Sequence, residues 1–209
     1  MPTNPARRKL LADAGLRVLA DAGARGLTHR AVDAEAGVPT GTCSNYFGSR
    51  DELLGALAEH ILVRIGPTPE RLRELADRPP GLDLLVDYIR YIVERTTEAP
   101  ELTVALFELR LEARRRPTLA ATLGDTIVGA YHDDVAFNLE RGLPGGATEI
   151  ALLRFAIDGL LLDRLTVPVA PDLDTDELVD TIVRRLVGHT GDGDSPPPSG
   201  ASDPRRAVQ

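Results

Sequence analysis

Short hydrogen-bonding side chains cluster in one stretch between Thr28 and Arg50. The cluster combines hydroxyls, an amide, a phenol and two guanidinium groups, which are the groups that contact phosphate oxygens and base edges in nucleic acids. The candidate contacts are Thr28, Arg30, Thr40, Gly41, Thr42, Ser44, Asn45, Tyr46 and Arg50. Their chemistry indicates recognition of a nucleic acid.

Two short helices are expected to position these side chains. Thr28 is a good N-cap for a helix that continues to about Glu35, and a shorter helix is expected from Thr40 to Tyr46. Gly37 lies between them, where a glycine can take the left-handed conformation of a tight bend. The polar face of the shorter helix then points outward, which is the arrangement of a helix-turn-helix that enters a major groove.

Helical periodicity continues through the rest of the chain, so we expect an all-α protein of about nine helices. Ser49 and Glu52 form a capping-box pattern at the start of a helix over residues 49–65. The start signals of the nine helices lie near Pro5, Thr28, Thr40, Ser49, Leu82, Pro100, Pro117, Thr148 and Asp174.

The pattern predicts two domains and a tail. Residues 1–50 form a three-helix DNA-binding domain, and residues 51–189 form a ligand-binding and dimerisation domain, with the helix over residues 49–65 connecting them. Residues 190–209 are rich in Gly, Pro, Ser and Asp and are expected to be disordered. The last two helices carry wide apolar faces, which suits pairing with a second copy of the chain.

The charge distribution supports a small nucleic-acid-binding domain. The net charge is −8, yet residues 1–50 hold seven Lys and Arg against four Asp and Glu. The rest of the chain therefore carries 17 basic and 28 acidic side chains. A positive first quarter on an acidic body is typical of a DNA-binding domain joined to another domain.

Several polar side chains interrupt apolar helices in the second domain and are candidates for orienting a small, mostly apolar ligand. They are Tyr88, Tyr131, Asn138, Arg154 and Asp158. The sequence favours a structural interpretation over this one, in which Arg154 and Asp158 form an i,i+4 ion pair and the two tyrosines are core rings with a hydroxyl at the surface.

The N-terminal part of the chain, as far as Leu54, resembles the TetR (tetracycline-repressor-like) family of regulators. The resemblance rests on Leu27-Thr28, Gly37-Val38, Gly41-Thr42, Tyr46-Phe47 and the segment over residues 49–54. It implies a dimeric repressor that binds a palindromic operator, is released by a small-molecule effector and dimerises through the last two helices. The composition, with one cysteine and no run of about 18 apolar residues, predicts a cytoplasmic protein without a metal, a cofactor or a membrane span.

Two positions depart from the family pattern. Cys43-Ser44 replaces a common Leu-Tyr pair, which shortens the reach of the side chain at Ser44. Pro39 replaces a common capping Ser, which moves the cap of the short helix to Thr40 or leaves that helix with a weaker cap.

Two other functions remain as alternatives. The first is a DNA-binding regulator without ligand control. The second is a helical-bundle enzyme, which needs inward-facing Glu-x-x-His pairs for a metal. None of the four histidines has a glutamate three residues before it, and neither a Ser-His-Asp set nor a phosphate-binding loop is apparent.

Overall fold

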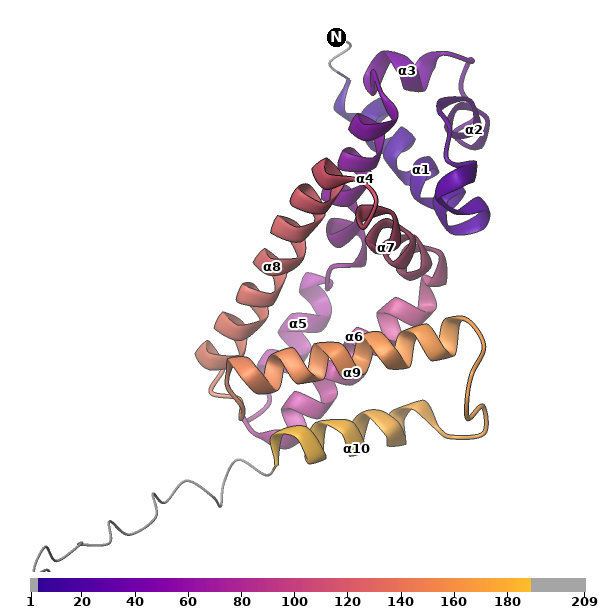
Figure 1. The fold of residues 1–209 in the computed structure, drawn as a ribbon. Coiled ribbons are helices and arrows are strands. Elements are labelled where there is room, and N and C mark those ends of the chain that lie inside the picture. Colours follow the sequence, from indigo (N-terminus) through magenta and orange to yellow (C-terminus); the bar gives the residue numbers. More distant parts are fainter. Residues whose placement is uncertain (1–3, 189–209) are drawn as a thin grey trace, which may run out of the picture.

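The computed structural model describes residues 4–188, and every regular element in this range is an α-helix (Figure 1). The all-α expectation is therefore confirmed for the described residues. The expected tail over residues 190–209 lies outside them. The helices are α1 (Pro5–Gly26), α2 (His29–Glu35), α3 (Thr42–Tyr46), α4 (Arg50–Ile65), α5 (Pro69–Ala76), α6 (Leu82–Glu98), α7 (Pro100–Ala113), α8 (Pro117–Glu140), α9 (Ala147–Leu165) and α10 (Thr175–Val187).

The caps of the N-terminal helices follow the sequence closely. The Thr28 hydroxyl accepts a hydrogen bond from the Ala31 amide at 3.1 Å, and the Ser49 hydroxyl accepts one from the Glu52 amide at 3.1 Å. The Glu52 carboxylate accepts from the amide of Gly48 at 2.7 Å, one residue before the expected capping-box partner. Both caps satisfy amides that have no partner inside their helix.

The recognition helix begins later than expected. The predicted start at Thr40 is wrong, because Gly41 takes a left-handed φ of 92° and α3 begins only at Thr42. Gly41 has no side chain, so α3 also lacks a side-chain cap of its own. Residues 39–41 are thus part of the turn.

The structure has a tenth helix in its described part, α5, where sequence reasoning found only a break. Its N-cap is Thr68, and a proline occupies its first turn. Leu75 is buried and Leu72, three residues earlier on the same face, is half-buried, so the segment carries a short apolar face over only two turns.

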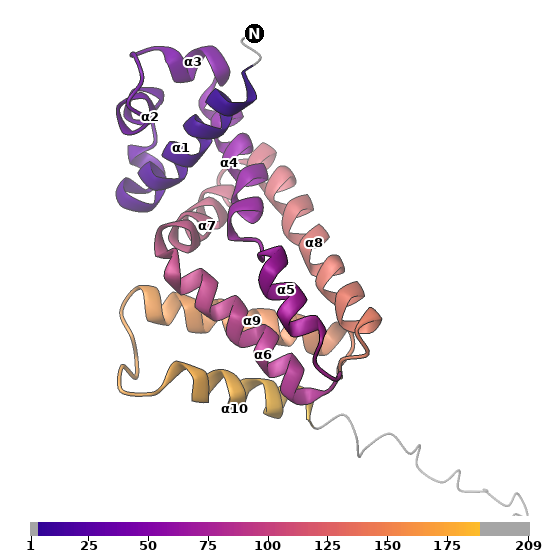
Figure 2. The same cartoon turned by 180° about the vertical axis from the view of Figure 1, so that it is seen from behind.

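The described residues form two apolar cores, and the boundary between these cores does not fall at residue 50. The first core joins α1–α4, which we call the head, to α7 and the beginning of α8 through Leu102, Leu109 and Leu119. The second core joins α5, α6, α9 and α10. Figures 1 and 2 show α7, α8 and the α6–α9 pair as three sides of a triangular body, with the head at one corner.

Candidate functional site

The outer surface of α3 carries the polar side chains that were expected to contact DNA. Thr40, Ser44 and Asn45 are exposed, and Thr42 and Tyr46 are half-buried. The opposite face of α3 packs into the head core through Cys43, and Phe47 follows it there. The helix therefore has one apolar face that fixes it and one polar face that is accessible to solvent. Figure 1 shows α3 at the outer end of the head.

The hydroxyls on this surface are already oriented by the backbone. The Thr42 hydroxyl donates to the carbonyl of Pro39 at 2.5 Å, and the Ser44 hydroxyl donates to the carbonyl of Gly41 at 2.9 Å. Their lone pairs are left to accept from base amino groups. The side-chain amide of Asn45 makes no hydrogen bond to any described residue, so both its donor and its acceptor are free.

Asp33 supplies the cap that α3 lacks, and sequence reasoning did not select it. Its side chain extends from α2 and is only 2% exposed. One carboxylate oxygen accepts from the Gly41 amide at 2.7 Å, and the other accepts from the Cys43 amide at 2.7 Å. A carboxylate also favours the positive end of a helix. Asp33 thus holds the start of the recognition helix against α2.

Basic side chains at the start of α1 border α3. Arg8 donates to the carbonyl of Tyr46 at 3.4 Å, and its guanidinium lies 4.6 Å from the centre of the Phe47 ring. Arg7 and Lys9, beside it in the sequence, are exposed. These cations entered the sequence argument only as part of the charge balance. Only the folded structure identifies them as candidate DNA contacts, because α1 brings them beside α3, which lies far along the chain.

The two arginines of the predicted set have different surroundings. Arg30 is exposed on α2. Arg50 donates through both terminal nitrogens to the carbonyls of Leu27 and Ala24, which ties the α1–α2 connection to the start of α4. We therefore leave Arg50 out of the proposed DNA contacts.

Cys43 is a packing residue in this head. The thiol is fully buried, and burial, followed by the nearby Asp33 charge, raises its pKa to about 12. A thiol reacts through its thiolate, which such an environment disfavours.

The head meets the body through acidic side chains of α7. Gly23 breaks α1 with a φ of 64°, and the Ala24 amide that follows donates to the Glu108 carboxylate at 3.2 Å. Further along α7, the buried Glu112 accepts from Arg116 at 2.6 Å, and Arg116 also donates to Asp51 of α4 at 2.6 Å. A shift of α7 would therefore act on both α1 and α4.

The three uncharged residues of the predicted ligand set have structural contacts. The Tyr88 ring packs edge-on against Phe137 with the ring centres 5.0 Å apart. The Tyr131 hydroxyl donates to the carbonyl of Ala147 at 2.9 Å. Asn138 is buried, and its amide nitrogen donates to three carbonyls of the α8–α9 turn, that of Gly145 at 2.8 Å being the nearest.

The expected ion pair between Arg154 and Asp158 is absent from the described structure, and that interpretation is wrong. Arg154 pairs with Asp134 of α8, and Asp158 pairs with Arg110 of α7 at 2.5 Å. The i,i+4 spacing of Arg154 and Asp158 places both side chains on one face of α9. The partners lie on neighbouring helices, which sequence spacing does not reveal.

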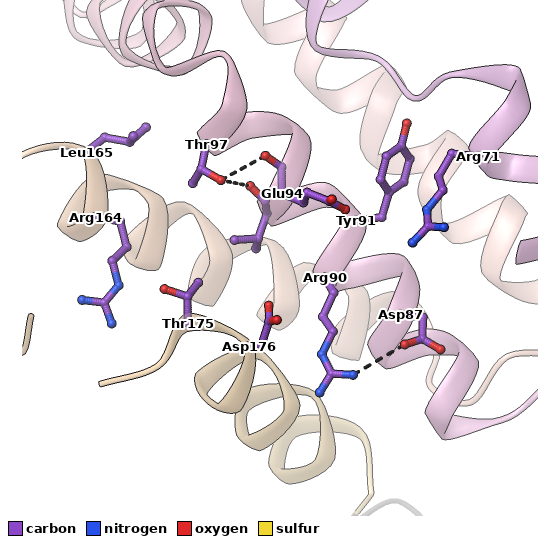
Figure 3. Close-up of a pocket in the computed structure, with 11 residues that line it drawn as sticks. Arg71, Asp87, Arg90, Tyr91, Glu94, Thr97, Arg164, Leu165, Thr175 and Asp176 are labelled. Atoms are coloured by element: carbon purple, nitrogen blue, oxygen red, sulfur yellow. Dashed lines mark hydrogen bonds and ion pairs between the residues drawn. The ribbon is translucent and has the colours of Figure 1, made fainter. Parts of the chain in front are cut away.

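A groove of about 560 Å³ lies between α5, α6 and the ends of α9 and α10 (Figure 3). Its charged lining is balanced, with Arg71, Arg90 and Arg164 against Asp87, Glu94 and Asp176. None of the five predicted ligand residues lines it. The described residues also contain no cluster of His, Cys, Asp and Glu suited to a metal ion, and none of their helices is long and apolar enough to cross a membrane.

Comparison with known proteins agrees with this geometry. The family profile described as "Bacterial regulatory proteins, tetR family" matches residues 11–57, and the profile "Tetracyclin repressor-like, C-terminal domain" matches residues 80–189. The chain belongs to the TetR family. It is therefore a DNA-binding transcriptional regulator of that family, as the resemblance in its N-terminal part indicated.

Individual relatives extend the likeness over most of the chain. The HTH-type transcriptional regulator BetI of Burkholderia mallei (strain NCTC 10229) is 39% identical over 162 residues, which cover 75% of this chain and 80% of BetI. The structure of multidrug binding protein EbrR complexed with ethidium has a TM-score of 0.65 and 26% identity, covering 88% of this chain and 100% of that one. The TetR-family member SCO1917 of Streptomyces coelicolor A3 has a TM-score of 0.67 and 26% identity, covering 88% and 99%.

Proposed function

We propose that this regulator is a ligand-responsive repressor that binds a palindromic operator as a homodimer and leaves it when a small molecule binds. The observation that carries the proposal is the exposed polar face of α3, fixed by Asp33 and bordered by the basic start of α1. In the proposed complex, Thr28, Arg30, Thr40, Gly41, Thr42, Ser44, Asn45 and Tyr46 contact the operator. The protein then acts in the cytoplasm, where its DNA is, without a metal or cofactor.

Selection of bound fragments from a genomic library tests sequence-specific DNA binding. On the selected duplex, Asn45→Ala removes a free amide that can pair with an adenine edge, a contact worth about 1–3 kcal/mol. Asp77→Ala, an exposed change at the end of α5, is the control and should bind as the wild type does. Equal affinity for operator and scrambled duplex would refute the proposal.

The basic border of α3 predicts a measurable salt dependence. Arg8 sits at the end of α3 nearest α1, where a phosphate next to the groove is within reach of a guanidinium. Arg8→Ala should lower the slope of log affinity against log salt by about one unit. It should do so equally on operator and scrambled DNA, because phosphate contacts carry no sequence information.

An exposed apolar stripe on α9 supports the homodimer. Leu152, Phe155 and Leu162 are 42%, 69% and 49% exposed and follow a heptad spacing, with Gly159 between the last two. Exposed stripes of this kind mark protein interfaces. The half-buried Leu178, Ile182 and Leu186 of α10 extend the apolar surface.

The oligomeric state tests this interface directly. Phe155→Arg puts a charge into the stripe and should turn a dimer into a monomer in sedimentation experiments. The control, Val63→Arg, changes a 75% exposed residue of α4 and should leave the dimer intact. A wild-type protein that is monomeric at micromolar concentration would contradict the proposed dimer.

Ligand control is supported by the relatives and by the charged side chains between the body helices. EbrR, similar to this chain over 88% of its length, is described as a multidrug binding protein and has been crystallised with ethidium. Thermal-shift screening against small molecules, followed by operator-release measurements on the hits, tests this part. Retained operator binding with no stabilising compound would favour the alternative, a DNA-binding regulator without ligand control.

A further inference from the structure

Among the arginines of α6, α7, α8 and α9, Arg95 is the one that makes no ion pair within the described residues. Arg154 of α9 pairs with Asp134 of α8, and Arg110 of α7 pairs with Asp158 of α9. Arg95 of α6 interacts electrostatically with Asp134 but makes no ion pair within the described part of the chain. These five groups from four helices therefore carry one more positive than negative charge; the exposed Asp133 also acts electrostatically on Asp134 but makes no ion pair with Arg95 in the described part of the chain.

Arg95 is held in a poorly solvated position. One terminal nitrogen donates to the carbonyl of Ile65, and the guanidinium lies 5.6 Å from the centre of the Tyr91 ring. Its Nε is buried and has no hydrogen-bond partner among the described residues. Burial lowers the pKa of Arg95 and raises the pKa of Asp134. The Nε atoms of Arg90, Arg141 and Arg164 also lack a partner among the described residues, but Arg90 and Arg164 are in ion pairs, whereas the half-buried Arg95 is not. Charges removed from water are normally paired, so the unpaired guanidinium of Arg95 is a candidate for binding a ligand.

We propose that Arg95 is the anion-binding group of the effector site and that the effector is a small organic carboxylate with an apolar body. The inference rests on the proposed ligand control. A carboxylate can accept two parallel hydrogen bonds from a guanidinium, including one from the free Nε. Ile92, one turn before Arg95, and Tyr131 and Val135, beside Asp134 on α8, are half-buried apolar side chains that suit the apolar body.

The same contact links effector binding to the DNA-binding head. Ile65 is the last residue of α4, and it packs against the core that joins the head to α7 and the beginning of α8. The edge of the guanidinium that carries Nε includes the other terminal nitrogen, so a carboxylate can bind there while Arg95 keeps its hydrogen bond to Ile65. An effector held by Arg95 is therefore connected through Ile65 to the end of α4. The head can then change its position relative to the partner head, which lowers operator affinity.

Matched probes of one shape and different charge test the inference. Benzoate, benzamide and benzamidine form one set, and octanoate and octylamine form another. Binding is measured by calorimetry and operator release by fluorescence anisotropy. Only the carboxylates should bind and release DNA. Arg95→Met should weaken their binding at least about tenfold, and Arg95→Lys, which keeps the charge but loses the paired N–H groups, should weaken it less.

A control variant on α6 and the outcomes with different compounds separate the anion site from ligand control in general. Arg90→Met, a change in the groove of Figure 3, should leave carboxylate binding unchanged. Carboxylate binding by Arg95→Met or Arg95→Lys at wild-type affinity would overturn the inference, as would carboxylates that fail to bind the wild type. If the amines or other compounds bind and release DNA, ligand control stands and the anion site fails. If no compound does, ligand control fails too.

Discussion

Replacing Asp33 by alanine should release the start of the recognition helix. The wild-type carboxylate is 2% exposed and accepts two hydrogen bonds of 2.7 Å, from the amides of Gly41 and Cys43. Hydrogen bonds to a charged group contribute about 1.5–3 kcal/mol each. Gly41 is half-buried, so water can replace part of its bond. We therefore expect Asp33→Ala to lower the free energy of unfolding by about 2–4 kcal/mol.

Urea unfolding and operator binding measure the two consequences of this change. Asp33→Asn keeps the shape and one acceptor but turns an NH2 group toward a second donor, so it should also destabilise the protein. Glu35→Ala is the matched control on the same helix. Glu35 pairs with Arg17 at 2.6 Å, but the two side chains are 40% and 45% exposed, and such pairs contribute less than about 1 kcal/mol.

Loss of the Asp33 carboxylate should also loosen the start of α3 itself. Hydrogen exchange at the Cys43 amide should accelerate in Asp33→Ala and stay unchanged in Glu35→Ala, because only Asp33 accepts from that amide. Operator affinity should likewise fall in Asp33→Ala and stay close to the wild-type value in Glu35→Ala. An Asp33→Ala protein within about 0.5 kcal/mol of Glu35→Ala, with unchanged operator affinity, would refute the role of Asp33 as the cap of α3.

Three other predictions concern the head. Gly23→Ala forces a side chain into a backbone conformation with φ of 64° and ψ of −179° and should cost about 1–3 kcal/mol in urea unfolding, whereas Gly55→Ala, inside α4, should not destabilise. Cys43, with its pKa raised to about 12 by burial, should resist alkylation at pH 8 until the protein is unfolded in urea; rapid labelling of the native protein would contradict its placement. Burial opposes ionisation of Asp13, but hydrogen bonds from His60 and Arg64 outweigh it and lower the Asp13 pKa below 3.8. Its stabilising effect is therefore complete above pH 3.8 and disappears as the pH falls through the lowered pKa, so Asp13→Asn should destabilise at pH 7 and converge with the wild type in acid unfolding.

Local sequence determined most of the helices and the surface of the DNA-binding head. Thr28, Ser49 and Asp174 cap their helices as predicted, because a cap needs only the backbone amides two or three residues away. The 3.6-residue period placed Ser44 and Asn45 on the exposed face of α3 for the same reason. The α5 helix was not predicted although Thr68-Pro69 is a start signal and Leu72 and Leu75 lie on one face, because a periodic pattern over only eight residues is weak evidence for a helix.

Contacts between distant segments were decided by the tertiary structure alone. Nothing in the sequence around α3 indicates that its cap comes from Asp33 of α2, or that Arg8 lies beside Tyr46. The spacing of Arg154 and Asp158 suggested a pair, yet each binds a residue of another helix. Charge pairing depends on the distances between side chains on different helices. Helix packing sets these distances, and the 3.6-residue period within one helix does not encode them. For that reason Arg95, which has no ion pair among the described residues, and with it the proposed anion site, became visible only in the folded chain.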